Sequence, residues 1–104
     1  MSLFGVKTVP CTLCGQSFQM VSGAMNHPAD VLCNSCLLEL YDRFFAEPLP
    51  AIRDSLVPRL KMRMGMGPDI LASGIADRLE RLTEHVHDRV ELENLLSRRA
   101  ILGG

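Results

Sequence analysis

The sequence predicts a small α+β fold, in which a β-hairpin and a helix come first and a mainly helical region with a long amphipathic helix follows. Three observations lead to this prediction. The 104-residue chain has four cysteines, arranged as two C-x-x-C pairs with 18 residues between them. Apolar residues at helical spacing follow the second pair directly, and residues 69–102 form a long helical pattern without proline.

The two cysteine pairs have the spacing of a tetrahedral zinc site. Two intervening residues allow one tight turn to direct both sulfurs at one ion, and the gap is long enough to bring the second pair back. We therefore predict one structural Zn2+ per chain, held by Cys11, Cys14, Cys33 and Cys36. Because four thiolates fill the coordination shell, such a site builds a fold and performs no reaction. A chelator is expected to unfold the N-terminal half.

Other interpretations of the cysteines and histidines have less support. A redox dithiol would need one C-x-x-C beside a thioredoxin-like pattern, and disulfides would need an oxidising compartment. His85 and His87 are two residues apart, so on a helix they point about 200° apart and cannot share one ion. His27 lies in a turn and could replace a cysteine, but four cysteines leave it unneeded.

Short strands are predicted around the first cysteine pair. Val6–Pro10 alternates apolar and polar residues and leads into the pair, and Gln16–Val21 follows as a second strand. Gly15 can adopt a left-handed conformation, which lets backbone N–H groups point at the sulfurs. After two turn signals, Val31–Leu32 is predicted to return as an apolar strand into the second pair.

The second cysteine pair is predicted to open a helix. Asn34 or Ser35 would serve as the N-cap, and the free N–H groups of the first turn favour thiolates. A knuckle, a hairpin and a knuckle that opens a helix together make a treble clef, whereas a zinc ribbon would place the second pair on another hairpin. The apolar residues of this helix recur at helical spacing, namely Leu37, Leu40, Tyr41 and Phe44.

Composition divides the chain into three segments. Residues 1–47 form the zinc-binding module, residues 48–68 a linker rich in proline, glycine and methionine, and residues 69–104 the long helix. Within the linker, Ala51–Val57 could form two helical turns, which Pro58 would end. The alternating methionines of the linker indicate a partner-facing segment rather than a soft-metal site; they are Met62, Met64 and Met66.

The long helix, capped by Asp69 or Ser73, carries an apolar seam that begins like a coiled coil. The same heptad then reaches Arg89 and Glu93, so the apolar stripe rotates and broadens. A stripe of this length must be buried, and the small zinc module offers too little surface for it. The sequence therefore predicts a homodimer through this helix. The seam residues are Ile75, Leu79, Leu82 and Val86.

Composition and missing motifs exclude several function classes. The chain is 47% hydrophobic and 22% charged with a net charge of −1, so it lacks the basic field of a phosphate-binding surface. It has no apolar run long enough for a transmembrane helix and no signal-peptide pattern, which favours a cytoplasmic location. Phosphate-loop, nucleophile-elbow and metalloprotease motifs are absent, so we expect that the protein is not an enzyme.

Residues 10–47 resemble the N-terminal zinc-binding domain of ClpX, the unfoldase partner of the ClpP protease. The resemblance lies in the four cysteines with their 18-residue gap, Gly15 and Ser17 after the first pair, and Pro28 before Val31–Leu32. It implies a treble-clef module that dimerises and recognises adaptors or substrates, with the same four cysteines as ligands. The ATPase module of ClpX has no counterpart here, so only a binding role carries over.

These observations predict a zinc-stabilised interaction module that acts as a small adaptor or regulator, linked by analogy to ATP-dependent proteolysis. The apolar residues expected to meet a protein partner are Leu13, Phe18, Val31 and Leu37. The alternative is a nucleic-acid-binding zinc-finger regulator. Its support is a set of basic residues in the linker and at the helix end, namely Arg59, Lys61, Arg63, Arg98 and Arg99.

Overall fold

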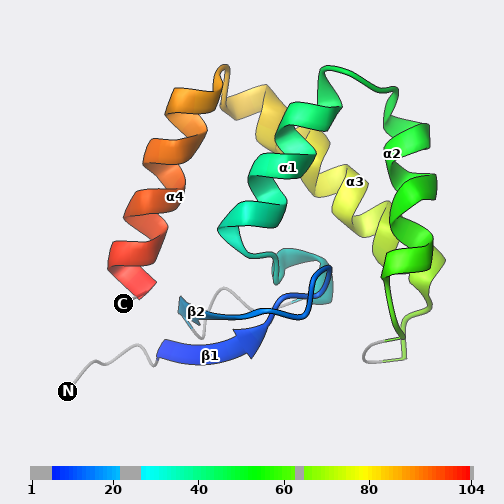
Figure 1. Ribbon diagram of the computed structural model, residues 1–104, viewed down its shortest axis with the longest axis horizontal. Coiled ribbons are helices and arrows are strands. Elements are labelled where there is room, and N and C mark those ends of the chain that lie inside the picture. The colour runs from blue at the N-terminus through cyan, green and yellow to red at the C-terminus, as the bar shows by residue number, and fades with distance from the viewer. Residues whose placement is uncertain (1–5, 22–26, 63–64, 104) are drawn as a thin grey trace.

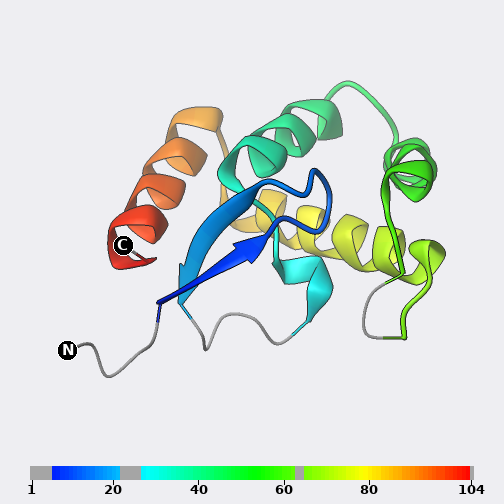
Figure 2. The same cartoon turned by 60° about the horizontal axis from the view of Figure 1, so that its bottom comes forward.

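The computed structural model describes residues 6–21, 27–62 and 65–103 of the chain. Within these residues, an antiparallel two-stranded hairpin is followed by four α-helices, which confirms the predicted small α+β fold. Helices α2 and α4 lie at opposite ends of the molecule, with α1 and α3 between them and the hairpin along one side (Figures 1 and 2). The helices of the described residues are too short or too polar to cross a membrane.

The hairpin encloses the first cysteine pair. Strands β1 (Val6–Pro10) and β2 (Ser17–Val21) pair antiparallel, with Val9 opposite Phe18. The two strands were both predicted, but the expected third strand at Val31–Leu32 was wrong. A 3-10 helix, η2 (Pro28–Asp30), and a segment outside any strand lead into the second cysteine pair instead.

Local chemistry explains why η2 replaces a strand. Pro28 has a fixed φ and no N–H group, so it begins a helical turn well and a ladder poorly. His27 caps this turn, because its Nδ1 accepts a hydrogen bond of 3.0 Å from the N–H of Ala29. A backbone hydrogen bond ties this segment to the first cysteine pair, because the N–H of Thr12 donates to the carbonyl of Val31 at 2.8 Å.

Helix α1 (Asn34–Phe44) begins directly at the second cysteine pair, as predicted. Its N-cap is Cys33 rather than Asn34 or Ser35, and no side chain caps the helix start. The helix buries one face, because Leu40 is 0% exposed and Tyr41 2% exposed.

The proline-rich middle of the chain forms a short helix against the core. Helix α2 (Leu49–Leu56) starts two residues before the predicted position, with Pro50 in its first turn. Pro58 ends the α-helix as expected, and a 3-10 helix, η3 (Val57–Arg59), follows. Of the linker methionines, Met62 is 70% exposed and Met66 packs against the core, while Met64 lies outside the described residues.

The prediction of one long helix over residues 69–102 was wrong. The structure has two helices, α3 (Pro68–His85) and α4 (Arg89–Gly103), and α3 is capped by Gly67 rather than by Asp69 or Ser73. At Val86 the backbone leaves the helical conformation and becomes extended. The carbonyl of Val86 accepts a hydrogen bond of 3.3 Å from the hydroxyl of Tyr41. This turn folds α4 back toward α1 and β2.

Asp88 restarts the helix after the break. Its Oδ1 accepts a hydrogen bond of 2.7 Å from the N–H of Glu91, and its carbonyl accepts the first helical bond from Leu92 at 3.1 Å. An acidic N-cap followed by Glu three residues later is a recognised helix-start pattern. The sequence therefore contained a local signal for this break, which the uninterrupted apolar pattern concealed.

One hydrophobic core joins all three predicted segments. It includes cysteines of both pairs, Leu40 from α1, Ile52 from α2 and Ile75 from α3. A second cluster lies between α1 and the last two helices, and consists of Tyr41, Val86, Leu92 and Leu96. Helix α3 approaches η2 closely at Gly74, where an added Cβ would come within 3.1 Å of the Cβ of Ala29.

The apolar seam of the long helical pattern is buried within the chain. Ile75, Leu79 and Val86 are 1%, 2% and 4% exposed, and Leu82 packs against the second cluster. The same chain covers this stripe, because η2 and α1 of the zinc module and α2 of the linker all pack against α3. A homodimer stays a prediction, but this seam no longer provides the argument for it.

We expect Asp88→Ala to destabilise the fold by about 0.5–2 kcal/mol, the usual cost of losing a helix N-cap. The reason is that the N–H of Glu91 loses its partner at the start of α4. Asp88→Asn is the matched control, because its side-chain oxygen can still accept this bond. Urea unfolding followed by circular dichroism measures both variants, and equal stabilities for the two would contradict the assigned cap.

Candidate metal centre

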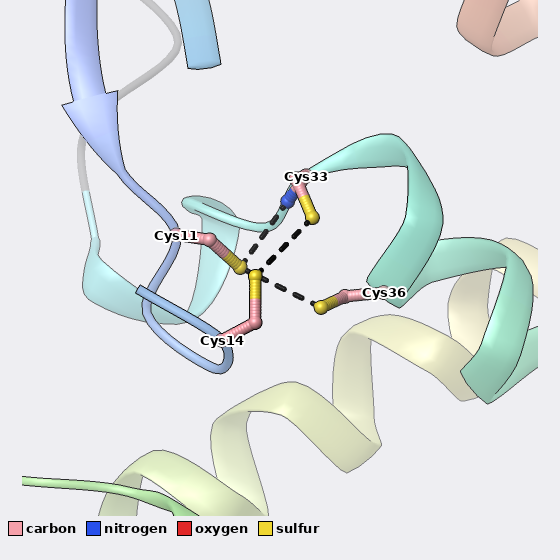
Figure 3. A group of neighbouring side chains, drawn as sticks. All are labelled: Cys11, Cys14, Cys33 and Cys36. Atoms are coloured by element: carbon pink, nitrogen blue, oxygen red, sulfur yellow. Dashed lines mark hydrogen bonds between the residues drawn. The ribbon is translucent and has the colours of Figure 1, made fainter. Parts of the chain in front are cut away.

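Four cysteine sulfurs meet where the hairpin loop faces the start of α1. Their Sγ atoms all lie within 4.8 Å of one another, and the four side chains point toward a common centre (Figure 3). Cys11 and Cys14 come from the loop between β1 and β2. Cys33 and Cys36 come from the N-cap and the first turn of α1. Among the described residues, no other group of histidine, cysteine and acidic side chains has metal-binding geometry.

Two of the sulfur separations match a tetrahedral metal shell. Sγ of Cys11 lies 3.7 Å from Sγ of Cys36, and Sγ of Cys14 lies 3.7 Å from Sγ of Cys33. Sulfurs placed about 2.3 Å from a tetrahedral metal are roughly 3.8 Å apart, whereas a disulfide bond measures about 2.05 Å. All four cysteines are free thiols. The four side chains are therefore positioned to hold a metal ion.

The first knuckle is a tight turn that the sequence predicted. Gly15 has a φ of +80°, the left-handed conformation expected for it. The N–H of Gly15 donates to the carbonyl of Cys11 at 2.9 Å, and the N–H of Cys11 donates to the carbonyl of Gln16 at 2.9 Å. These two bonds close the loop and fix the separation of the first two sulfurs.

Thr12 ties the first knuckle to the segment before the second pair, a role that the sequence reasoning missed. The side chain is 5% exposed, and its hydroxyl donates a hydrogen bond of 2.7 Å to the carbonyl of Pro28. A threonine between two metal-ligating cysteines was the available signal, because a small hydroxyl can satisfy a buried carbonyl.

The second knuckle uses the backbone of the helix start. Cys33 has an extended N-cap conformation, and its N–H donates to Sγ of Cys11 at 3.4 Å. The N–H groups at the start of a helix carry partial positive charge. The N–H of Cys33 therefore favours the thiolate form of Cys11.

The pKa values of the thiols differ because their surroundings differ. Burial raises the pKa of Cys11, but backbone hydrogen bonds from Cys14, Cys33 and Leu13 outweigh burial and lower it from 9.0 to about 7. Burial raises the pKa of Cys33, and backbone N–H of Cys36 opposes this only in part. Burial and the neighbouring cysteines raise the pKa of Cys36.

We expect metal affinity to increase with pH. Because burial raises the pKa values of Cys33 and Cys36, these two thiols are protonated at neutral pH without metal and must release their protons to the solvent when metal binds. Calorimetry in buffers of different ionisation enthalpy should show this proton release. An affinity that does not change between pH 6 and 9 would contradict it.

Three of the four cysteines in this centre are buried. Cys11, Cys33 and Cys36 are 0%, 7% and 4% exposed and belong to the main hydrophobic core, whereas Cys14 is exposed. A metal here would therefore join the hairpin, α1 and the core that α2 and α3 share.

The residues predicted to meet a partner lie beside this centre, and one of them, Leu13, is buried. Leu13 is 5% exposed and belongs to the core, so the expectation that it presents apolar surface was wrong. Phe18 and Leu37 are half-buried and pack against the core, and Val31 is half-buried in the segment before Cys33.

Comparisons with protein-family models, curated proteins and solved structures give no match to this chain. The resemblance to the ClpX zinc-binding domain therefore depends on the residues that carry it. What the structure adds is that the four cysteines of this motif come together as a metal centre.

Proposed function

We propose that the four cysteines hold one structural Zn2+ per chain, and that the chain is a zinc-stabilised protein-interaction module. The observation that carries the metal assignment is the pair of 3.7 Å sulfur separations. Four thiolates at tetrahedral separation are the donor set of structural zinc sites. A metal bound this way has no open position, which supports a structural role and not a catalytic one.

An interaction role is supported by apolar side chains that the fold leaves exposed. Phe45 is 64% exposed at the end of α1, and Val90 is 66% exposed in the first turn of α4. An ion pair between Asp42 and Arg89 joins these two helices. The zinc-stabilised core thus holds α1 and α4 together and presents apolar residues from both, as a partner surface requires.

The resemblance to the ClpX zinc-binding domain supports one particular process for this interaction role. We propose that the module acts in the cytoplasm as an adaptor or regulator of ATP-dependent proteolysis, binding a protein partner and performing no catalysis itself. A purified ClpX–ClpP protease tests this, because the added chain should change the rate at which a reporter substrate is degraded. Phe45→Ser should weaken the effect, and the control Ala46→Ser, at an exposed neighbouring position, should leave it intact.

Two described arginines give the nucleic-acid alternative no support. Arg59 lies 3.4 Å from a carboxylate oxygen of Glu39, and Arg53 lies 3.5 Å from one of Asp54. Local acidic groups thus offset these charges. The side chains of Arg63, Arg98 and Arg99 lie outside the described residues.

Metal analysis and mass in solution test the basis of the proposal. Protein purified without added metal should contain about one zinc ion per chain. Light scattering at micromolar concentration should show whether two copies associate, as the predicted homodimer requires. Protein that is folded without bound metal would remove the zinc assignment.

A further inference from the structure

One of the four cysteines in the candidate metal centre is exposed to solvent. Cys14 is exposed, whereas Cys11, Cys33 and Cys36 are buried. We propose that Cys14 is a site of oxidative modification by peroxides, with Cys33 as the second cysteine, and that the disulfide formed between them releases the metal. This inference rests on the proposed zinc site.

Access determines which thiolate reacts first. Oxidation of cysteine follows its thiolate character and its exposure. All four sulfurs are thiolates in a metal-loaded centre, so exposure alone separates them. Cys11 and Cys36 are 0% and 4% exposed, which leaves Cys14 as the sulfur that a peroxide in solution can reach.

Proximity supports Cys33 as the second cysteine. Sγ of Cys14 lies 3.7 Å from Sγ of Cys33 (Figure 3), so the two sulfurs must approach by about 1.7 Å to reach disulfide length. Cys33 is the buried N-cap of α1. Cys14 is exposed, so its side chain has room to make this approach.

The reaction balances with peroxide as the oxidant. The Cys14 sulfur attacks one peroxide oxygen, so that an S–O bond forms, the O–O bond breaks and hydroxide or alkoxide leaves. The Cys33 sulfur then attacks the Cys14 sulfur, so that an S–S bond forms, the S–O bond breaks and hydroxide leaves. The two sulfurs lose two electrons to the peroxide, and the two leaving anions take up protons from water.

The disulfide would weaken the fold through the core. Cys14 and Cys33 no longer serve as ligands, and Cys11 and Cys36 alone supply too few sulfurs for a closed tetrahedral site. Because Cys11, Leu13 and Cys36 belong to the main core, loss of the metal loosens the hairpin against α1. The centre would therefore report peroxide as a change in the fold that presents the partner surface.

Oxidation of the zinc-loaded protein tests this inference. The zinc content is measured first. Protein that contains no zinc would contradict the proposed function, whereas zinc-loaded protein that resists peroxide would contradict only the inference drawn here. Hydrogen peroxide is then added with a chromophoric zinc indicator, and the cysteines are mapped by alkylation and mass spectrometry. The expected result is release of the bound zinc together with a Cys14–Cys33 disulfide, and trapping with a sulfenic-acid reagent should label Cys14 first.

Two histidine variants provide a matched pair. Cys14→His keeps a fourth zinc ligand that peroxide does not oxidise in this way, so zinc release should slow several-fold. Cys36→His also keeps four ligands but retains the Cys14–Cys33 pair, so release should persist. If a variant does not fold, the order of labelling in the natural chain decides. Zinc that stays bound at peroxide concentrations that oxidise free cysteine, or first labelling at a buried cysteine, overturns the inference.

Discussion

Removal of the metal is expected to unfold the entire chain, including α2 and α3, and not the N-terminal half alone. Cys11, Cys33 and Cys36 lie in the same core as Ile52 and Ile75. Structural zinc contributes about 10–16 kcal/mol of apparent binding free energy, whereas domains of this kind are stable by only about 5–15 kcal/mol. A zinc ion bound by these cysteines would therefore supply a free energy comparable to the whole stability of the fold.

Circular dichroism with a strong chelator measures this loss. Cys36→Ser should reproduce it without a chelator, because the variant removes a ligand that is 4% exposed. Ser35→Ala is the control, since Ser35 is exposed beside the ligand and should leave helix content unchanged. Slow hydrogen exchange that survives at the α3 amides after chelation would show that the helices fold without the metal centre.

Ile75→Ala is expected to destabilise the monomer by about 2–5 kcal/mol, the usual cost of a large-to-small change in a packed core. Ile75 is 1% exposed and packs in the core between α3 and the cysteine centre. Urea unfolding measures the change. The effect should be the same at every protein concentration, because the contacts lie within one chain.

Ile70→Ala is the matched control on the same helix. Ile70 is 59% exposed, so its truncation should change stability by no more than about 0.5 kcal/mol. If Ile75→Ala instead weakened association between chains and left monomer stability unchanged, the seam of α3 would be an intermolecular surface as the sequence first indicated.

Local patterns predicted the grouping of the four cysteines well. The ligand spacing, the left-handed Gly15 and the helix that starts at the second pair each depend on a few consecutive residues. The strand expected at Val31–Leu32 failed because its pairing depended on a distant partner. Strand β2 already pairs with β1, and Pro28 with His27 favours the turn η2.

The helical half of the chain shows what the spacing of apolar residues could and could not predict. The apolar seam identified the buried face of α3, and Ile75 and Leu79 are buried there. The pattern could not show that the stripe is covered by the same chain, because the covering surfaces come from η2, α1 and α2. It also concealed the break at Val86, where the capping residue Asp88 competes with continued helix.

By itself, the sequence determined the grouping of the four cysteines, the knuckle at Gly15 and the helix that starts at the second pair, because short-range turn and helix chemistry specifies them. The tertiary structure alone decided two further features. These are the burial of the seam and of Leu13 within one core, and the exposure of Cys14. The physical reason is that burial depends on which distant segments pack together, and residue spacing along the chain does not encode that directly.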